Sequence, residues 1–174
     1  MTTQSFDYTL DGLEFDAVLV AGERPNAATV LVFHGMEGRS DAQVEFCHRL
    51  AALGYRAVAV DVFGRDVTTA GPDACAAAMS AFLDDRNALR DRIIGVTGAI
   101  RDVLEVDAGA MAAIGFCFGG LCVLDASRHG AGLRAIGAFH GLLTALPEPP
   151  EDPIGTRIAV YHGWDDPFAP PSDA

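Results

Sequence analysis

Short apolar segments that alternate with helical stretches are the feature that most limits the fold of this chain. Residues 29–33 (TVLVF) and 56–62 (RAVAVDV) are almost continuously apolar, as strands covered on both faces of a sheet are. Strands are predicted at 15–20, 29–33, 56–62, 110–116, 135–139 and 157–161, and helices at 41–53, 74–104 and 119–127. This alternation predicts an α/β fold with a doubly wound, mostly parallel sheet and helices on both faces.

The length of the chain suits one such domain. With 174 residues, half of them hydrophobic, residues 1–174 form a single predicted domain with a normal apolar core. The long helical segment 74–104 is expected to break near 84–85 or near 95–98. Glycine and proline predict loops at 63–73 and 146–153.

The charge balance excludes several classes of protein. The net charge is −12, from 24 acidic and 12 basic residues, which argues against a nucleic-acid or anionic-membrane surface. All basic residues are arginine, and a chain without lysine forms neither a Schiff base nor the lysine contact of a P-loop. The sequence shows no secretory signal, no bilayer-spanning apolar run and no C-x-x-C pair among its four cysteines. We therefore expect a cytoplasmic protein with reduced thiols.

The segment Gly115–Gly120 (GFCFGG) lies at a predicted strand-to-helix junction and is the strongest indication of chemistry. It has the pattern of a nucleophile elbow, G-x-nucleophile-x-G, with cysteine at the central position. The flanking glycines lack the β-carbons that so tight a turn excludes, and the turn exposes the side chain of Cys117. The N-terminal end of the following helix lies under the sulfur and favours the thiolate. A glycine-rich turn beside a buried thiol is the alternative interpretation.

A second predicted loop supports the catalytic interpretation. His34 and Gly35 follow the strand 29–33, where proteins with such an elbow supply one amide of the oxyanion hole. The backbone N–H groups of Met36 and Phe118 are therefore the candidates to converge on a developing oxyanion. Removing one such donor typically costs about 2.7–4 kcal/mol of transition-state stabilisation. For His34, a structural role in its own loop is favoured over that of a catalytic base.

The loop after the last predicted strand carries a candidate acid. In the segment 162–170 (HGWDDPFAP), Asp166 precedes a proline and follows the nucleophile, which matches the chain order nucleophile, acid, histidine. The role of such a carboxylate is to hold the imidazole in one tautomer and to stabilise the imidazolium. Asp165 is less favoured, and an acidic turn without a catalytic role is the alternative.

Together these motifs resemble the dienelactone hydrolase family of α/β-hydrolases. The resemblance covers essentially the whole chain and is most specific at GFCFGG, at 54–65 (GYRAVAVDVFGR) and at 162–170. It implies that Cys117 is the nucleophile and Asp166 the triad acid, with the two amides named above as the oxyanion hole. The implied reaction is hydrolysis of a small ester or lactone through a thiolate acyl-enzyme, without a metal or a cofactor.

Two departures from the family pattern concern the site. Family members place a glutamate directly after the residue that opens the first loop, whereas this chain has Gly35 there and Glu37 two positions later. Members also carry the triad histidine a few tens of residues beyond the acid, and no histidine follows Asp166 here. We therefore expect a C-terminally truncated fold in which 157–161 is an exposed edge strand, open to self-association.

The remaining candidates are expected to line the substrate pocket. They are Gly35, Glu37, His140 and Trp164. For Glu37, a solvated loop charge is the equal alternative. His140 is the best local replacement for the missing imidazole, although contact with the substrate or a structural role is favoured for it. His162 is expected to order its own loop.

Two other functions stay open at this point. The chain can be a fragment or pseudo-enzyme that acts as a binding module for a small ligand, or for a partner that covers its open edge. A thiol-redox role for Cys117 and Cys122 is weaker, because their spacing is not that of a C-x-x-C motif. A hydrolase predicts turnover of activated esters that depends on Cys117, whereas a binding module predicts none.

Overall fold

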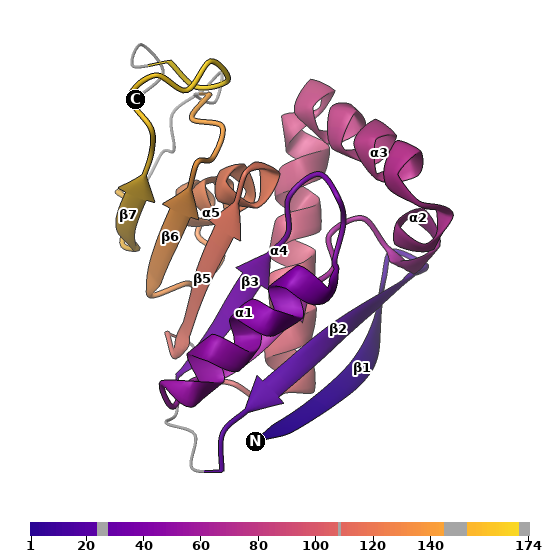
Figure 1. Ribbon diagram of the computed structural model, residues 1–174, viewed down its shortest axis with the longest axis vertical. Helices are drawn as coiled ribbons and strands as arrows, with labels where there is room; N and C mark the ends of the chain where they lie inside the picture. Colours follow the sequence, from indigo (N-terminus) through magenta and orange to yellow (C-terminus); the bar gives the residue numbers. More distant parts are fainter. Residues whose placement is uncertain (24–27, 108, 145–152, 171–174) are drawn as a thin grey trace.

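Seven strands form one sheet in the computed structural model, which describes residues 1–23, 28–107, 109–144 and 153–170 (Figure 1). They are β1 (Thr2–Leu10), β2 (Leu13–Ala21), β3 (Thr29–Phe33), β4 (Arg56–Val60), β5 (Met111–Phe116), β6 (Ala135–Phe139) and β7 (Arg157–Tyr161), in the spatial order β1-β2-β4-β3-β5-β6-β7. The strands from β4 through β3, β5 and β6 to β7 pair in parallel, whereas β1 and β2 form an antiparallel hairpin that pairs with β4. The predicted α/β fold with a mostly parallel sheet is confirmed.

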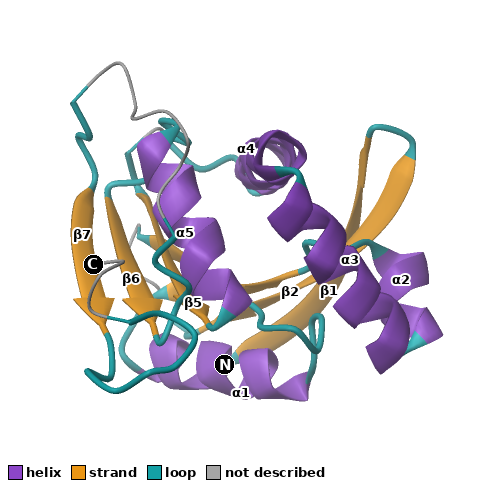
Figure 2. Ribbon diagram, turned by 90° about the horizontal axis from the view of Figure 1, so that it is seen from above, coloured by secondary structure: helices purple, strands orange, loops and turns teal. Residues whose placement is uncertain are grey.

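The helices cover both faces of this sheet. They are α1 (Asp41–Ala52), α2 (Arg65–Ala70), α3 (Pro72–Asp84), α4 (Arg86–Val103) and α5 (Phe118–Arg128). Viewed from above, α1 lies on one side of the sheet, and α3, α4 and α5 lie on the other (Figure 2). In the described residues, no helix is both long and apolar enough to cross a membrane.

The long helical segment breaks where an aspartate can cap a new helix. The helix α3 ends at Asp84, and the side chain of Asp85 accepts hydrogen bonds from the first amides of α4. The alternative break at 95–98 is wrong, because both glycines lie inside α4. A Cβ on Gly95 would lie 2.7 Å from Leu10, so this glycine lets β1 approach the helix.

Two segments differ from the sequence prediction. The strand β1 was not predicted, because only one of its residues, Tyr8, is buried and the apolar signal is correspondingly weak. The predicted loop 63–73 is wrong in part, since it contains the short helix α2, which is bounded by glycines at both ends. The predicted loop 146–153 lies, except for its last residue, outside the described residues.

The last strand, β7, is the edge of the sheet next to the candidate site. All five of its residues are exposed, and Ile158 and Val160 have 43% and 45% of their surface in solvent. The prediction of an exposed apolar edge strand is confirmed. Because parallel strands end on the same side, the loops after β3, β5, β6 and β7 all leave the sheet at its carboxyl edge (Figure 1).

Candidate active site

Cys117 occupies the sharp turn between β5 and α5, in a backbone conformation that side chains rarely adopt. Its φ and ψ angles are 54° and −118°, and its side chain is partly exposed. A residue with a β-carbon in such a region costs about 1–3 kcal/mol. The turn is held because the Cys117 N–H donates to the Phe139 carbonyl at 3.1 Å, and the Cys117 carbonyl accepts from the Gly120 N–H at 2.9 Å.

The glycines of the elbow are there because the backbone passes too close for a side chain. A Cβ on Gly115 would overlap the carbonyl of Gly119, and a Cβ on Gly119 would lie 2.5 Å from the Phe33 carbonyl oxygen. A Cβ on Gly120 would lie 2.6 Å from the Cα of Gly141, a glycine that sequence reasoning did not single out. The tight, glycine-flanked turn predicted around Cys117 is therefore present, and the loops after β3, β5 and β6 meet around it.

His34 is a structural residue of the loop after β3, as the sequence suggested. Its ring is fully buried, with Nδ1 2.7 Å from the Gly35 carbonyl oxygen and Nε2 3.1 Å from the Val62 N–H. These contacts fit a neutral imidazole with its proton on Nδ1, which donates to Gly35 while Nε2 accepts from Val62. Burial lowers the pKa of His34 to about 4, which keeps the ring neutral at physiological pH.

The two candidate oxyanion amides extend from neighbouring strand ends. Phe33 at the end of β3 pairs with Gly115 on β5. Met36 lies three residues after Phe33, and Phe118 lies three residues after Gly115. Among the described residues, neither the Met36 N–H nor the Phe118 N–H donates to a protein acceptor. Both amides are therefore available to bind a ligand oxygen.

The carboxylate of Glu37 is turned back onto its own loop. Its Oε1 accepts from the Gly35 N–H at 3.3 Å and from the Nε2 of Gln43 at 2.8 Å. Gln43, which is buried in the first turn of α1, was not predicted to take part. Its only signal in the sequence is its place three residues after Ser40, as in a capping box.

Asp166 lies in the loop after β7 and is bonded within that loop. Its Oδ1 accepts from the Phe168 N–H at 2.9 Å, and its Oδ2 lies 3.9 Å from the Nε2 of His162. His162 is held by the carbonyl oxygen of Ala169 at 2.8 Å, so it orders its own loop. Trp164 is 79% exposed at the tip of this loop.

His140 follows β6 beside the elbow. Its φ is 38°, and its N–H donates to the Tyr161 carbonyl on β7 at 2.8 Å. It comes directly after Phe139, whose carbonyl holds the Cys117 N–H, and its ring centroid lies 6.3 Å from that of Phe116. The side chain is exposed at the carboxyl edge of the sheet, next to the candidate nucleophile.

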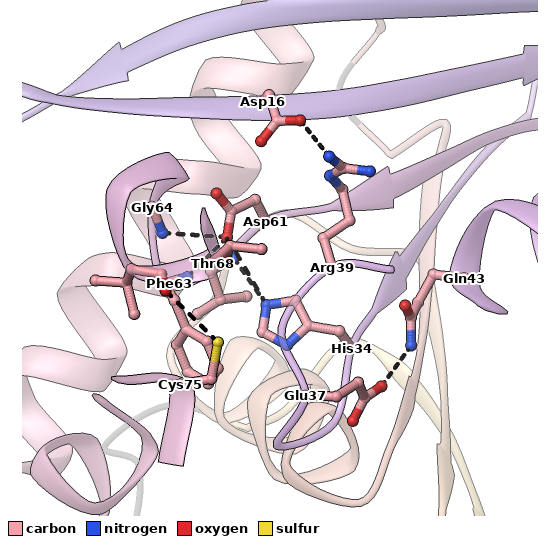
Figure 3. A network of polar contacts seen from close by, with 12 residues as sticks. Asp16, His34, Glu37, Arg39, Gln43, Asp61, Phe63, Gly64, Thr68 and Cys75 are labelled. Carbon is pink, nitrogen blue, oxygen red and sulfur yellow. Dashed lines mark hydrogen bonds and ion pairs between the residues drawn. The ribbon is translucent and has the colours of Figure 1, made fainter. Parts of the chain in front are cut away.

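A buried carboxyl group, that of Asp61, holds the loop after β4 at the carboxyl edge of the sheet. Asp61 directly follows β4, and its Oδ1 accepts from the N–H groups of Phe63 and Gly64 and from the Thr68 hydroxyl (Figure 3). Burial raises the pKa of Asp61. An acid directly after an apolar strand is the sequence signal that could have identified this group.

The other thiols are not placed for the same chemistry. Cys122 lies inside α5 and is fully buried, and burial raises its pKa well above the ordinary value. All four cysteines are free. Within the residues that the structure describes, no group of three His, Cys, Asp or Glu side chains is arranged to hold a metal ion.

The sheet order, the strained cysteine at a strand-to-helix elbow and the two open amides define an α/β-hydrolase. More specifically, the chain belongs to the dienelactone hydrolase family, whose sequence pattern matches residues 15–174. This family and fold are those of hydrolases.

Solved structures and one curated protein are similar to this chain. The structure named m3DLH is 34% identical, with a TM-score of 0.80, over 99% of this chain and 72% of its own. P91 from metagenomic libraries, described as a dienelactone hydrolase-like promiscuous phosphotriesterase, is 33% identical with a TM-score of 0.84 over the same shares. Uncharacterized protein K02A2.1 of Caenorhabditis elegans is 40% identical over 82 residues, which are 45% of this chain and 52% of that protein. The chain thus spans about half the length of the curated relative that it matches.

Proposed function

We propose that this chain hydrolyses small carboxylic esters or lactones through an acyl-enzyme on Cys117. The observation that carries the proposal is the conformation of Cys117, with φ 54° and ψ −118° between glycines that cannot hold side chains. Such strain persists only where the surroundings enforce it, and it is characteristic of functional sites. The elbow presents the sulfur at the carboxyl edge of the sheet, where α/β folds bind their ligands.

In the proposed reaction the Cys117 thiolate attacks the ester carbonyl carbon, and the carbonyl oxygen becomes an oxyanion between the Met36 and Phe118 N–H groups. The tetrahedral intermediate collapses, the C–O bond breaks, and the leaving alkoxide takes a proton from water, while the acyl group stays on the sulfur as a thioester. Water then adds to the thioester, and the acid is released as the thiol is restored. In a lactone, the alcohol and the acid remain one molecule.

The other predicted residues have supporting roles in this proposal. Asp166 is the carboxylate that would orient a catalytic imidazole, and His140 and Trp164 contact the substrate from the loops after β6 and β7. Gly35 and Glu37 belong to the wall formed by the loop after β3. The proposed substrate is a small molecule, and the proposed chemistry requires only groups of the protein and water.

A phosphotriester is the second candidate substrate. It is favoured by the 33% identity over 99% of this chain to a structure described as a promiscuous phosphotriesterase. A thiolate with two oxyanion donors can attack phosphorus as well as carbon, with a phosphoryl oxygen taking the place of the carbonyl oxygen.

The test is cleavage of p-nitrophenyl acetate by the wild type and by Cys117→Ala, followed beyond one equivalent of nitrophenol. Sustained turnover that Cys117→Ala abolishes supports the hydrolase. A burst that stops near one equivalent supports the elbow and the oxyanion hole but indicates that deacylation fails, as expected for a binding module derived from a hydrolase. Equal cleavage by both proteins overturns the assignment of Cys117. A p-nitrophenyl phosphotriester, tested in parallel, decides between the two substrates.

A further inference from the structure

A clamp formed by the side chains of Glu37 and Gln43 closes the loop that follows β3, residues 34–38, and Figure 3 shows the contact between these two side chains. The Glu37 carboxylate folds back and accepts from the Gly35 N–H at 3.3 Å, which closes a short turn around Met36. The other carboxylate oxygen lies only 2.6 Å from the position that a Cβ on Gly35 would take. A side chain at position 35 would therefore expel the carboxylate, so the glycine and the clamp belong together.

Gln43 ties this carboxylate to the start of α1. Its Oε1 accepts from the Ser40 N–H at 2.9 Å, and its Nε2 donates to Glu37 Oε1 at 2.8 Å. A backbone N–H can only donate, so the oxygen of the Gln43 amide must face Ser40 and the NH₂ group must face Glu37. Gln43 is 5% exposed, and leaving one of the polar groups of a buried side chain without its partner lowers the stability of the fold.

The two ends of loop 34–38 are fixed independently of the clamp. At its start, both ring nitrogens of His34 are bonded to backbone groups. Just beyond its end, Arg39 forms an ion pair with Asp16 on β2. Between these anchors Met36 is 50% exposed, so its own side chain does little to hold it. The direction of the Met36 N–H therefore depends on the turn that Glu37 closes.

We propose that Glu37 and Gln43 are positioning residues that aim the Met36 N–H at the oxyanion, an inference that rests on the proposed function. Neither side chain needs to touch the reacting atoms, because both act through the backbone of the loop. A donor that is displaced by a fraction of an ångström stabilises the developing charge of the transition state much less. The resting enzyme carries no such charge, so the displacement does not affect its stability.

The test compares two reactions of Cys117 that differ in their need for an oxyanion hole. Acylation by p-nitrophenyl acetate passes through an oxyanion, whereas alkylation by iodoacetamide does not. We expect Gln43→Glu, which brings two carboxylates together, and Glu37→Ala, which removes the clamp, each to slow acylation about tenfold or more, on the scale of losing part of one donor. Alkylation should stay within about twofold of the wild type, because the elbow is unchanged.

A double variant separates positioning from simple damage. In Glu37→Gln/Gln43→Glu the amide at position 37 can accept from the Gly35 N–H and donate to the carboxylate at position 43, which still accepts from Ser40. This exchange rebuilds the clamp in reverse, so acylation should recover to within about threefold of the wild type. Glu45→Gln, on the exposed face of α1, is the matched control and should change neither rate.

The outcomes distinguish this inference from the proposed function. If wild-type Cys117 is not acylated, the proposed function fails and the clamp with it. If the wild type is acylated and Gln43→Glu reacts equally well, the clamp alone is overturned. A parallel loss of acylation and alkylation, or no recovery in the double variant, also overturns it. Should Glu37→Ala fail to fold, Gln43→Glu and the double variant, which preserve side-chain size, still decide.

Discussion

Replacing Cys117 with glycine should leave the protein more stable than replacing it with alanine. At φ 54° and ψ −118°, a residue with a β-carbon costs about 1–3 kcal/mol, whereas glycine adopts the conformation freely. Glycine also has more conformational freedom in the unfolded chain, and this entropy removes about 0.5–1 kcal/mol of that advantage. The net difference in unfolding free energy should therefore be about 1 kcal/mol in favour of Cys117→Gly.

Alanine is the right comparison because both substitutions remove the thiol and only one keeps the β-carbon. Urea unfolding followed by circular dichroism gives the difference, provided that both variants show the same denaturant dependence. Ala42→Gly, at an exposed position in the first turn of α1, is the control and should lose about 0.5–1 kcal/mol. If Cys117→Gly is less stable than Cys117→Ala by a similar amount, the backbone at position 117 is not strained.

Three further substitutions or titrations probe the support of the site. Gly119→Ala brings a Cβ to 2.5 Å from the Phe33 carbonyl oxygen, so it should lower the unfolding free energy by about 2 kcal/mol or more in urea. The pKa of His34 is lowered to about 4 in the folded protein, whereas an unfolded histidine titrates near 6.5. Between about pH 4 and 6.5 the unfolded state therefore binds a proton that the folded state does not. Stability should therefore fall as the pH drops from about 6.5 to 4, by up to about 1.4 kcal/mol per pH unit, and His34→Gln should flatten that slope in urea melts at several pH values. Arg86→Ala removes the two-pronged partner of the buried Asp125 carboxylate, which keeps its contact with Arg128 at 3.0 Å, so the variant should lose about 2 kcal/mol in a thermal melt. A loss within 0.5 kcal/mol, about the size of a surface substitution, would show that Arg128 alone satisfies the carboxylate.

The parts of the fold that are buried on both faces could be predicted from the sequence. The strands β3 and β4 are continuous apolar runs with no other way to bury their side chains, and both were found at or near the predicted bounds. The strand β1 gave no such signal, because one of its faces is in solvent. The pair Asp11-Gly12, which was not used in the prediction, could have indicated the hairpin, because both residues have the positive φ that this tight turn requires.

The elbow could be predicted because its pattern is local in the chain. Gly115, Cys117 and Gly119 fall within five residues, and the close approaches that they permit are set by one turn. The clamp on the loop after β3 could not be predicted, since the role of Glu37 depends on which way its carboxylate turns. That direction is set by Gln43, whose amide is itself oriented by the capping of α1.

For Asp166, the sequence motif predicts the position in the chain but not the contacts of the side chain. The sequence places it correctly in the loop after β7, and in the structure it contacts Phe168 and His162 of the same loop. These contacts depend on how the loop folds, which the sequence motif does not specify. The same holds for His140, which lies next to the elbow by virtue of the Phe139 carbonyl bond rather than through any pattern in the sequence.

The proposed function depends on a covalent acyl-enzyme at Cys117, and this species can be trapped. The protein is mixed with p-nitrophenyl acetate, quenched in acid within the first turnover, digested and examined by mass spectrometry, with Cys117→Ala treated in parallel. We expect one acetyl group on the peptide that contains Cys117, appearing at the rate of the first nitrophenol release. Nitrophenol release without acetyl on that peptide, or with acetyl on another residue, would contradict it.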